Sequence, residues 1–421
     1  MKKNIIKELK ERGILNNISN ENKLLNMNEN EVIYAGFDPT ATSLHLGNYI
    51  QICTLLRLQK IGIKVIALIG GATGMIGDPS FNESERKLLD FQEVEKNKNF
   101  ISQQLSKFNI EIFDNLSIYK NMSILTFLRE AGKFLNINYM IAKDSVANRL
   151  ETGLSFTEFS YQLIQGWDFN YLYENYNVVG QLGGSDQWGN ITSGIEIIRK
   201  KHGDNHKAFA LTTNLLTDKN GVKFGKSTGG GSLWLNKNLT SVYKLYQFLL
   251  NQDDEDVEKL LKYLTFLSLD EIKNLINKHN QDKSQRLAQK TLAFEIVKDI
   301  HSIEEANNSV KITDILFNKS DFNLLNADDL KQLENSVPLI EVNENELVID
   351  ILLKNKIVQS RREFREFITQ GALLLNNQKV LNEFEIIKNN LFDGKYALLK
   401  KGKRNYFVIK FKVGNYESRN C

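Results

Sequence analysis

Residues 32–48, with the sequence VIYAGFDPTATSLHLGN, constrain the fold more than any other stretch of the chain. The apolar run at the start of this stretch is typical of a buried strand, and Asp38-Pro39 ends it. An amphipathic period then begins at Leu46 and predicts a helix. We therefore expect a strand, a tight loop and a helix, with Ser43 as the N-cap of the helix.

The first turn of this helix is expected to carry chemistry. It would contain His45 and Gly47, where free backbone N–H groups and the positive end of the helix dipole favour a phosphate. Glycine in a helix costs about 1 kcal/mol relative to alanine, so the bare backbone is expected to serve a purpose, such as packing against a flat ring. For an isolated motif of this kind, a helix start with a solvated histidine is the simpler interpretation.

A second apolar run, at residues 64–70, is typical of a parallel strand that is covered on both faces. Strand, helix and strand within about forty residues make a βαβ unit, which places the chain in the α/β class. The run continues into a glycine-rich loop, 70–79, whose spacing resembles some dinucleotide-binding turns and leaves a nicotinamide-dependent oxidoreductase as an alternative. Asp78-Pro79 stops the helix that such a turn requires, so a ligand loop at the end of a strand is favoured.

The helix predicted over 151–169 has a polar line on one face. Glu158, Tyr161, Gln165 and Asp168 recur at steps of three and four. Such a line is either a solvent-exposed stripe or the wall of a pocket. The spacing alone favours the solvent-exposed stripe.

Two further glycine-rich segments follow. Residues 181–190 form a turn after a short strand, before a helix over 191–201. Residues 218–231 contain a GKS triplet, but Asn220 stands where a phosphate-binding P-loop needs glycine. We expect a loop that carries Lys223 and Lys226 and can close on a polyphosphate. A flexible hairpin without a ligand is the alternative.

The charge of the chain is unevenly distributed. Its 421 residues predict two or three domains and carry a net charge of +3. Residues 346–421 contain 15 Lys and Arg against 8 Asp and Glu, which suggests a polyanionic partner for the C-terminal part or simply a solvated basic surface. Two cysteines, no apolar leader and no membrane-length apolar stretch favour a cytoplasmic location without membrane contact.

Six segments of the chain, taken in order, resemble bacterial-type tyrosyl-tRNA synthetases. They are YAGFDPTATSLHLGN, GGATGMIGDPS, NYMIAKDSV, ETGLSFTEFSY, GGSDQWGNI and KFGKS. By this resemblance HLGN and KFGKS correspond to the two signatures of a class I, Rossmann-type catalytic domain. The last 75 or so residues resemble the S4-type RNA-binding domain of the family.

The resemblance implies a fold and a domain order. A Rossmann-type α/β catalytic domain with a parallel sheet would occupy residues 1–220. The signature loop and an α-helical domain would follow over 221–320, then a linker over 321–345. A small α+β, S4-like RNA-binding domain would span 346–421, and residues near 124–140 would form the interface of a homodimer.

The resemblance also implies a tyrosine–tRNA ligase that uses ATP, L-tyrosine and tRNA(Tyr), with Mg²⁺ on the ATP phosphates and no dedicated protein metal site. An RNA-binding scaffold that has lost catalysis, and a synthetase for tryptophan, are the alternatives. The catalytic residues would be Thr40, His45, Lys223, Lys226 and Ser227, and ATP would contact Gly36, Asp38, Gly47, Asn48, Gly183, Asp186 and Lys226. Tyrosine would contact Tyr34, Asp78, Tyr161, Gln165, Asp168 and Gln187, and tRNA would contact Arg86, Arg361, Arg362, Arg365, Lys400, Lys401, Lys403 and Arg404.

Three positions depart from the family pattern. Asn48 replaces the second histidine of the first signature, and Asn82 stands where many relatives carry a lysine. The TGGG sequence after Lys226 is one residue longer than the commonest form. These departures affect the expected ribose contact, one phosphate contact and the closing of the loop.

Overall fold

The chain packs into two compact units, the first comprising residues 1–236 and 253–281 and the second residues 237–252 and 282–421. The computed structural model describes residues 2–80, 88–147, 149, 153–217, 224, 232–317, 324–334, 336–402 and 405–412. Within these residues no helix is long and apolar enough to cross a bilayer.

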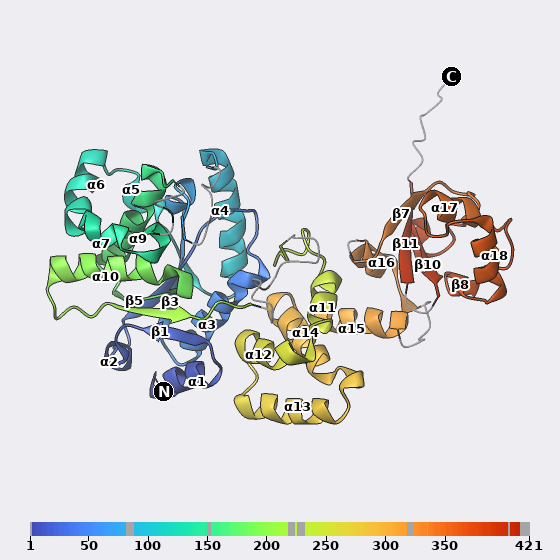
Figure 1. Ribbon diagram of the computed structural model, residues 1–421, viewed down its shortest axis with the longest axis horizontal. Coiled ribbons are helices and arrows are strands. Elements are labelled where there is room, and N and C mark those ends of the chain that lie inside the picture. Colours follow the sequence, from blue (N-terminus) through green and yellow to red (C-terminus); the bar gives the residue numbers. More distant parts are fainter. Residues whose placement is uncertain are drawn as a thin grey trace, which may run out of the picture. The chain divides into compact units, whose positions relative to one another are not determined.

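The first unit contains a six-stranded sheet in the order β1-β6-β5-β2-β3-β4 (Figure 1). Its strands are β1 (Leu15–Ile18), β2 (Val32–Phe37), β3 (Lys64–Ile69), β4 (Glu111–Asp114), β5 (Val178–Gly184) and β6 (Phe209–Thr213). All neighbouring pairs are parallel except β1 and β6. The chain therefore runs outward from β2 in both directions, and the point where the strand order reverses lies beside β2.

Helices cover both faces of this sheet, as the apolar strand runs predict. Tyr34 and Leu68 pack with Phe169 of α9 (Phe156–Asn175) and Ile191 of α10 (Trp188–His202). Helices α3 (Tyr49–Lys60) and α4 (Phe91–Ser106) contact the same strands and complete a three-layer arrangement (Figure 1). The remaining helices of this unit are α1 (Lys2–Glu11), α2 (Glu21–Leu25), α5 (Leu116–Tyr119), α6 (Ile124–Glu130), α7 (Ile137–Ile141), α8 (Asp144–Ala147), α12 (Asp254–Leu264) and α13 (Leu269–Gln281).

The helix start after β2 differs from the sequence prediction. A 3₁₀ turn, Leu46–Asn48, precedes α3, and the Asn48 side chain accepts a hydrogen bond from the His45 backbone N–H at 3.1 Å. The predicted N-cap, Ser43, is wrong, because its hydroxyl donates to the Leu44 carbonyl and accepts from Gln104. Asn48 therefore has a structural role at this turn.

The second unit is built on a five-stranded sheet in the order β7-β11-β10-β8-β9. One face packs on α17 (Val348–Lys354) and α18 (Arg361–Thr369), and the other packs on α11 (Val242–Leu250), α15 (Ile303–Phe317) and α16 (Ala327–Leu333). Ser360 caps α18 by accepting from the Glu363 backbone N–H. The other elements are α14 (Leu287–Ile300), β7 (Leu339–Val342), β8 (Leu373–Leu375), β9 (Gln378–Lys379), β10 (Tyr396–Lys401) and β11 (Asn405–Phe411).

These packing units do not follow the four expected segments. Helices α12 and α13 belong to the unit with the six-stranded sheet. Helices α11, α14 and α15 belong to the unit with the five-stranded sheet. The expected linker, 321–345, contains α16 and β7 among its described residues. The four-segment division, which the resemblance implies, stays a prediction.

Candidate active site

A cavity of about 360 Å³ opens at the carboxyl ends of β2, β5 and β6 in the first unit. Ligands of open α/β sheets bind at this edge, where the strand order reverses. Most of the residues predicted to bind ATP or tyrosine line this cavity. They are Tyr34, Gly36, Asp38, Thr40, His45, Gly47, Asn48, Asp78, Tyr161, Gln165, Asp168, Gly183, Asp186 and Gln187.

Asp168 is a buried carboxyl of this cavity, only 1% exposed. Its oxygens accept hydrogen bonds from the Tyr119 hydroxyl at 2.5 Å and from Asn115 Nδ2 at 2.9 Å. Burial raises the pKa of Asp168 to about 8, against the effect of these two hydrogen bonds. The buried Tyr34 hydroxyl has no hydrogen-bond partner among the described residues. This region of the cavity therefore presents a hydroxyl without a hydrogen-bond partner in the described structure, from Tyr34, and the carboxyl of Asp168.

A hydrogen-bonded chain connects Asp168 with Asp38 after β2. Asn115 Nδ2 also lies 3.3 Å from Thr73 Oγ1, and Thr73 donates to Asp38 Oδ1 at 2.7 Å. The other Asp38 oxygen accepts from the Tyr161 hydroxyl at 2.7 Å. The two carboxyls are thus held in fixed orientations by side chains from three different elements.

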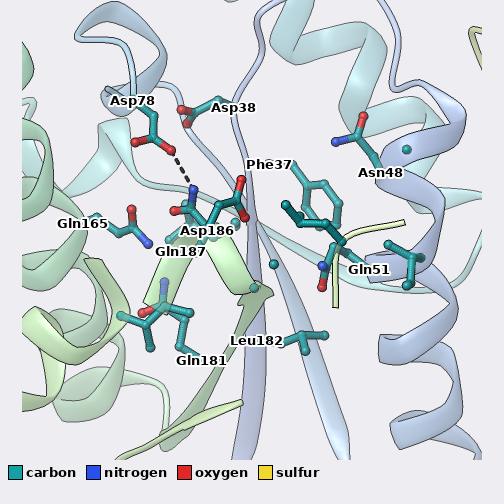
Figure 2. Close-up of a pocket in the computed structure, with 18 of the residues that line it drawn as sticks. Phe37, Asp38, Asn48, Gln51, Asp78, Gln165, Gln181, Leu182, Asp186 and Gln187 are labelled. Atoms are coloured by element: carbon teal, nitrogen blue, oxygen red, sulfur yellow. Dashed lines mark hydrogen bonds between the residues drawn. The ribbon is translucent and has the colours of Figure 1, made fainter. Parts of the chain in front are cut away.

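Asp78 and Gln187 form another polar group at the cavity wall, together with Gln165 (Figure 2). Gln187 Nε2 donates to Asp78 Oδ2 at 2.7 Å, and the Ser80 backbone N–H donates to Asp78 Oδ1 at 2.9 Å. Gln165 Oε1 is buried without a partner in the described structure. A carboxylate beside an unpartnered amide oxygen suits a ligand that carries an ammonium group.

The polar line on α9 is therefore a cavity wall over most of its length, and the solvent-exposed stripe is wrong. Tyr161, Gln165 and Asp168 line the cavity. Glu158 is also buried, but it pairs with the Arg149 guanidinium at 3.0 Å instead of facing the cavity.

His45, Gly47 and Asn48 form the opposite end of the cavity, where Figure 2 shows Asn48 and Gln51. A Cβ atom on Gly47 would lie 3.0 Å from two ring atoms of His45 and 3.4 Å from the Phe224 carbonyl oxygen. The bare backbone at Gly47 therefore lets the imidazole and the chain at Phe224 approach closely. The structure thus gives a packing reason for this glycine.

Residues within and after the second signature lie beside His45 and its turn. Trp234 forms a β-bridge with His45, and the Leu46 backbone N–H donates to the Leu233 carbonyl at 2.8 Å. Phe224 lines the cavity. Lys223, Lys226 and Ser227, predicted on this loop, lie outside the described residues, as do Asn82 and Arg86.

The glycines of loop 70–79 have packing roles. A Cβ on Gly71 would lie 2.2 Å from Asp114 Oδ1, and a Cβ on Gly74 would lie 2.9 Å from Pro39 Cδ. Gly77 has a φ of 86°, which favours glycine. Close approach between loops thus explains the spacing that resembled a dinucleotide turn.

All of the predicted tRNA contacts except Arg86 belong to the second unit. The side chains of Arg361, Arg362 and Arg365 are 58%, 89% and 64% exposed, and each pairs with a carboxylate. Lys401 is largely buried and donates to Glu363, and Lys400 lies over the Tyr406 ring. Lys403 and Arg404 lie outside the described residues.

Comparisons with known proteins agree with this geometry. Residues 26–318 match the family of class I tRNA synthetases for tryptophan and tyrosine, and residues 329–409 match a tyrosine–tRNA ligase C-terminal domain. The tyrosine–tRNA ligase of Mycoplasmopsis synoviae strain 53 is 52% identical over 409 residues, which cover 97% of this chain and 99% of that protein. The chain belongs to the tyrosine–tRNA ligase family. The enzyme of Ureaplasma urealyticum serovar 10 is 48% identical, with 96% of this chain and 98% of that protein covered.

A solved structure of this ligase family has the same fold. The C-terminally truncated mitochondrial tyrosyl-tRNA synthetase of Aspergillus nidulans is 31% identical, with a TM-score of 0.67 over 74% of this chain and 94% of that one. ATP is a substrate of class I tRNA synthetases. Among the described residues no three His, Cys, Asp or Glu side chains could together hold a metal ion.

Several polar residues of this cavity were not predicted from the sequence. Asn115 and Tyr119 hold Asp168, and Gln51 and Gln181 line the cavity with buried, unpartnered amide oxygens within the described structure. Asn115 directly follows strand β4, whose short sequence EIFD gives only a weak strand signal.

Proposed function

We propose that the cavity binds L-tyrosine and ATP side by side, joins them as tyrosyl-adenylate with release of pyrophosphate, and then transfers the tyrosyl group to tRNA(Tyr). The tyrosine carboxylate is already a nucleophile, so the first step depends on stabilising charge on the phosphates. One observation carries the proposal: the Tyr34 hydroxyl and Asp168 share a cavity with His45 and the turn that follows it.

The phenol of tyrosine would bind between the Tyr34 hydroxyl and Asp168. Its ammonium group would bind at Asp78, Tyr161 and Gln165, with Gln187 holding Asp78. Phenylalanine would leave Tyr34 and Asp168 without their partner, and buried polar groups that lose a partner reject such an analogue strongly. Strong rejection of phenylalanine is already known for this class of enzyme. The pair of Tyr34 and Asp168 fits such rejection.

ATP would occupy the other end of the cavity. Thr40 and His45 would contact the phosphates, Gly36, Asp38, Gly183 and Asp186 would surround the nucleotide, and the adenine would lie near Gly47 and Asn48. The open space above Gly36, where a Cβ would meet nothing within 4 Å, supports a ligand at that position. Lys223, Lys226 and Ser227 would close on the pyrophosphate, supported by the β-bridge between His45 and Trp234. Mg²⁺ would arrive with the ATP phosphates.

The second unit would bind tRNA. Exposed Arg361, Arg362 and Arg365 on α18 support this proposal; together with Arg86, Lys400, Lys401, Lys403 and Arg404 they would contact the phosphate backbone. The carboxylates now paired with the three arginines would release them to the RNA.

The chain is also proposed to form a homodimer in the cytoplasm. Large apolar side chains are exposed together on α6 and beside it: Ile124 at 70%, Leu125 at 75% and Ile137 at 64%. A second copy would cover them. A Leu125→Glu variant should sediment as a monomer where the parent sediments as a dimer.

Amino-acid-dependent ATP–pyrophosphate exchange, run with each of the twenty amino acids, tests the proposal. We expect exchange with tyrosine, no more than trace exchange with phenylalanine or tryptophan, and loss of exchange in Asp168→Ala. An RNA-binding scaffold would show no exchange at all. Activation of tryptophan in place of tyrosine would assign the cavity to the other substrate of the family.

A further inference from the structure

Tyr119 lies beside the buried Asp168 and outside the six segments that resemble the family. It ends α5, the short helix after β4, and its ring packs edge-on against Phe127 with ring centres 5.8 Å apart. This contact packs the ring, and the two oxygens beside the hydroxyl fix its direction. The Tyr119 oxygen lies 2.5 Å from Asp168 Oδ1 and 2.9 Å from the Ile164 carbonyl oxygen.

One hydroxyl hydrogen cannot serve both of these oxygens. If Tyr119 donates to the Ile164 carbonyl, the carboxyl of Asp168 must carry the proton that lies between them. If Tyr119 donates to Asp168, the carboxyl is an anion and an acceptor. The 2.5 Å separation is typical of a hydroxyl that donates to a carboxylate.

Asn115 fixes the other oxygen of the same carboxyl. The Ala72 backbone N–H donates to Asn115 Oδ1 at 2.7 Å, so the amide orientation is determined and its NH₂ group faces Asp168. Asp168 therefore has one donor on each oxygen, and the remaining lone pairs are free to accept from a ligand in the cavity.

We infer that Tyr119 is a positioning residue for tyrosine recognition: it donates to the anionic form of Asp168, the form that accepts from the substrate phenol, and thereby favours that form in a fixed orientation. This inference rests on the proposed function, in which Asp168 binds that phenol. The titratable groups that face Asp168 are Tyr34 from β2, Asp38 from the loop after it, Tyr119 from α5 and Tyr161 from α9. Asp38 disfavours the anionic form of Asp168, whereas Tyr119 favours it.

The variant Tyr119→Phe removes this hydroxyl and keeps the ring that packs on Phe127. Without the donor, Asp168 should hold its proton to higher pH. The pH dependence of kcat/KM reports ionisations of the free enzyme, so the rise of kcat/KM for tyrosine with pH should move to higher pH. At pH 7 we expect kcat/KM for tyrosine to fall about tenfold or more, the effect of losing a hydrogen bond to a charged group. The value for phenylalanine should not fall, because that substrate has no hydroxyl.

Phe127→Leu is the matched control, because it disturbs the same packing but leaves the Tyr119 hydroxyl in place. We expect it to lower the melting temperature without moving the pH profile or the ratio of tyrosine to phenylalanine activation. In the Asp168→Asn background, Tyr119→Phe should have no further effect on that ratio, because Tyr119 acts through Asp168.

A Tyr119→Phe protein that is folded by circular dichroism and keeps the parent pH profile and substrate ratio would overturn the inference. Such a result would leave the proposed function intact, provided that the parent enzyme shows tyrosine-dependent exchange. If the parent shows none, the proposed function itself has failed, and the two failures are thus distinguished.

Discussion

Replacing Asp168 with asparagine should change how the stability of the protein depends on pH. Burial raises the pKa of Asp168 from 3.8 to about 8 in the folded, ligand-free protein. Between these two values the folded state binds a proton that the unfolded state has lost, so the free energy of unfolding falls as the pH rises. The slope is about 1.4 kcal/mol per pH unit, which gives about 3 kcal/mol between pH 5 and pH 7.

Asparagine cannot titrate, so Asp168→Asn should not lose this stability. The difference between the variant and the parent should therefore grow in favour of the variant by about 3 kcal/mol over these two pH units. Tryptophan fluorescence during urea unfolding is a suitable measurement, because Trp167, Trp188 and Trp234 all belong to the first unit. Asp204→Asn, at a side chain that is 85% exposed, is the control and should show a constant difference.

A difference between Asp168→Asn and the parent that stays constant from pH 5 to pH 7 would refute the reasoning. It would mean that Asp168 ionises in the folded protein as readily as in the unfolded chain. The same variant should activate tyrosine far more weakly than the parent at every pH, so that stability and activity oppose each other at a single side chain.

Three further outcomes follow from particular contacts. Gly180→Ala should lower the free energy of unfolding by about 1–3 kcal/mol in urea titrations, because its Cβ would lie 2.7 Å from the Phe209 ring and 2.9 Å from Ile33. His45→Ala should reduce kcat for pyrophosphate exchange by about 100-fold or more with a smaller change in the KM for ATP, if the imidazole acts on the phosphates mainly in the transition state; equal changes in both would contradict that role. Burial lowers the pKa of His206 to about 4, so acidification from pH 6.5 to 4.5 should destabilise the parent more than His206→Gln, as thermal melting at both values would show.

The strands that lie in the middle of the first sheet could be predicted from the sequence. The apolar runs at 32–35 and 64–70 became β2 and β3, because a strand covered on both faces has no polar positions to obscure it. Strands β1 and β4 have the sequences LNNI and EIFD and lie at the two edges of the sheet. Each is only four residues long and half polar, so neither run stands out, and both were missed.

Periodicity alone could not show that the polar line on α9 is a cavity wall. A spacing of three and four residues shows that side chains share a face of a helix, but it does not show what lies opposite that face. On α9 the opposite side is the end of β2, and Tyr161 donates to Asp38, 123 residues earlier in the chain. Only the resemblance to a known family could indicate that contact before the structure was known.

Among the described residues, four buried polar atoms without partners lie where the ligands are proposed to bind. Tyr34 Oη and the amide oxygens of Gln51, Gln165 and Gln181 are buried and unpartnered within the described structure, and all four residues line this cavity. Leaving such a group unpaired costs about 1–3 kcal/mol, and the buried Asp168 adds a further cost at neutral pH. Substrates that donate to these oxygens recover that free energy on binding. The same groups therefore reduce the stability of the empty enzyme and increase its selectivity for a ligand with matching donors.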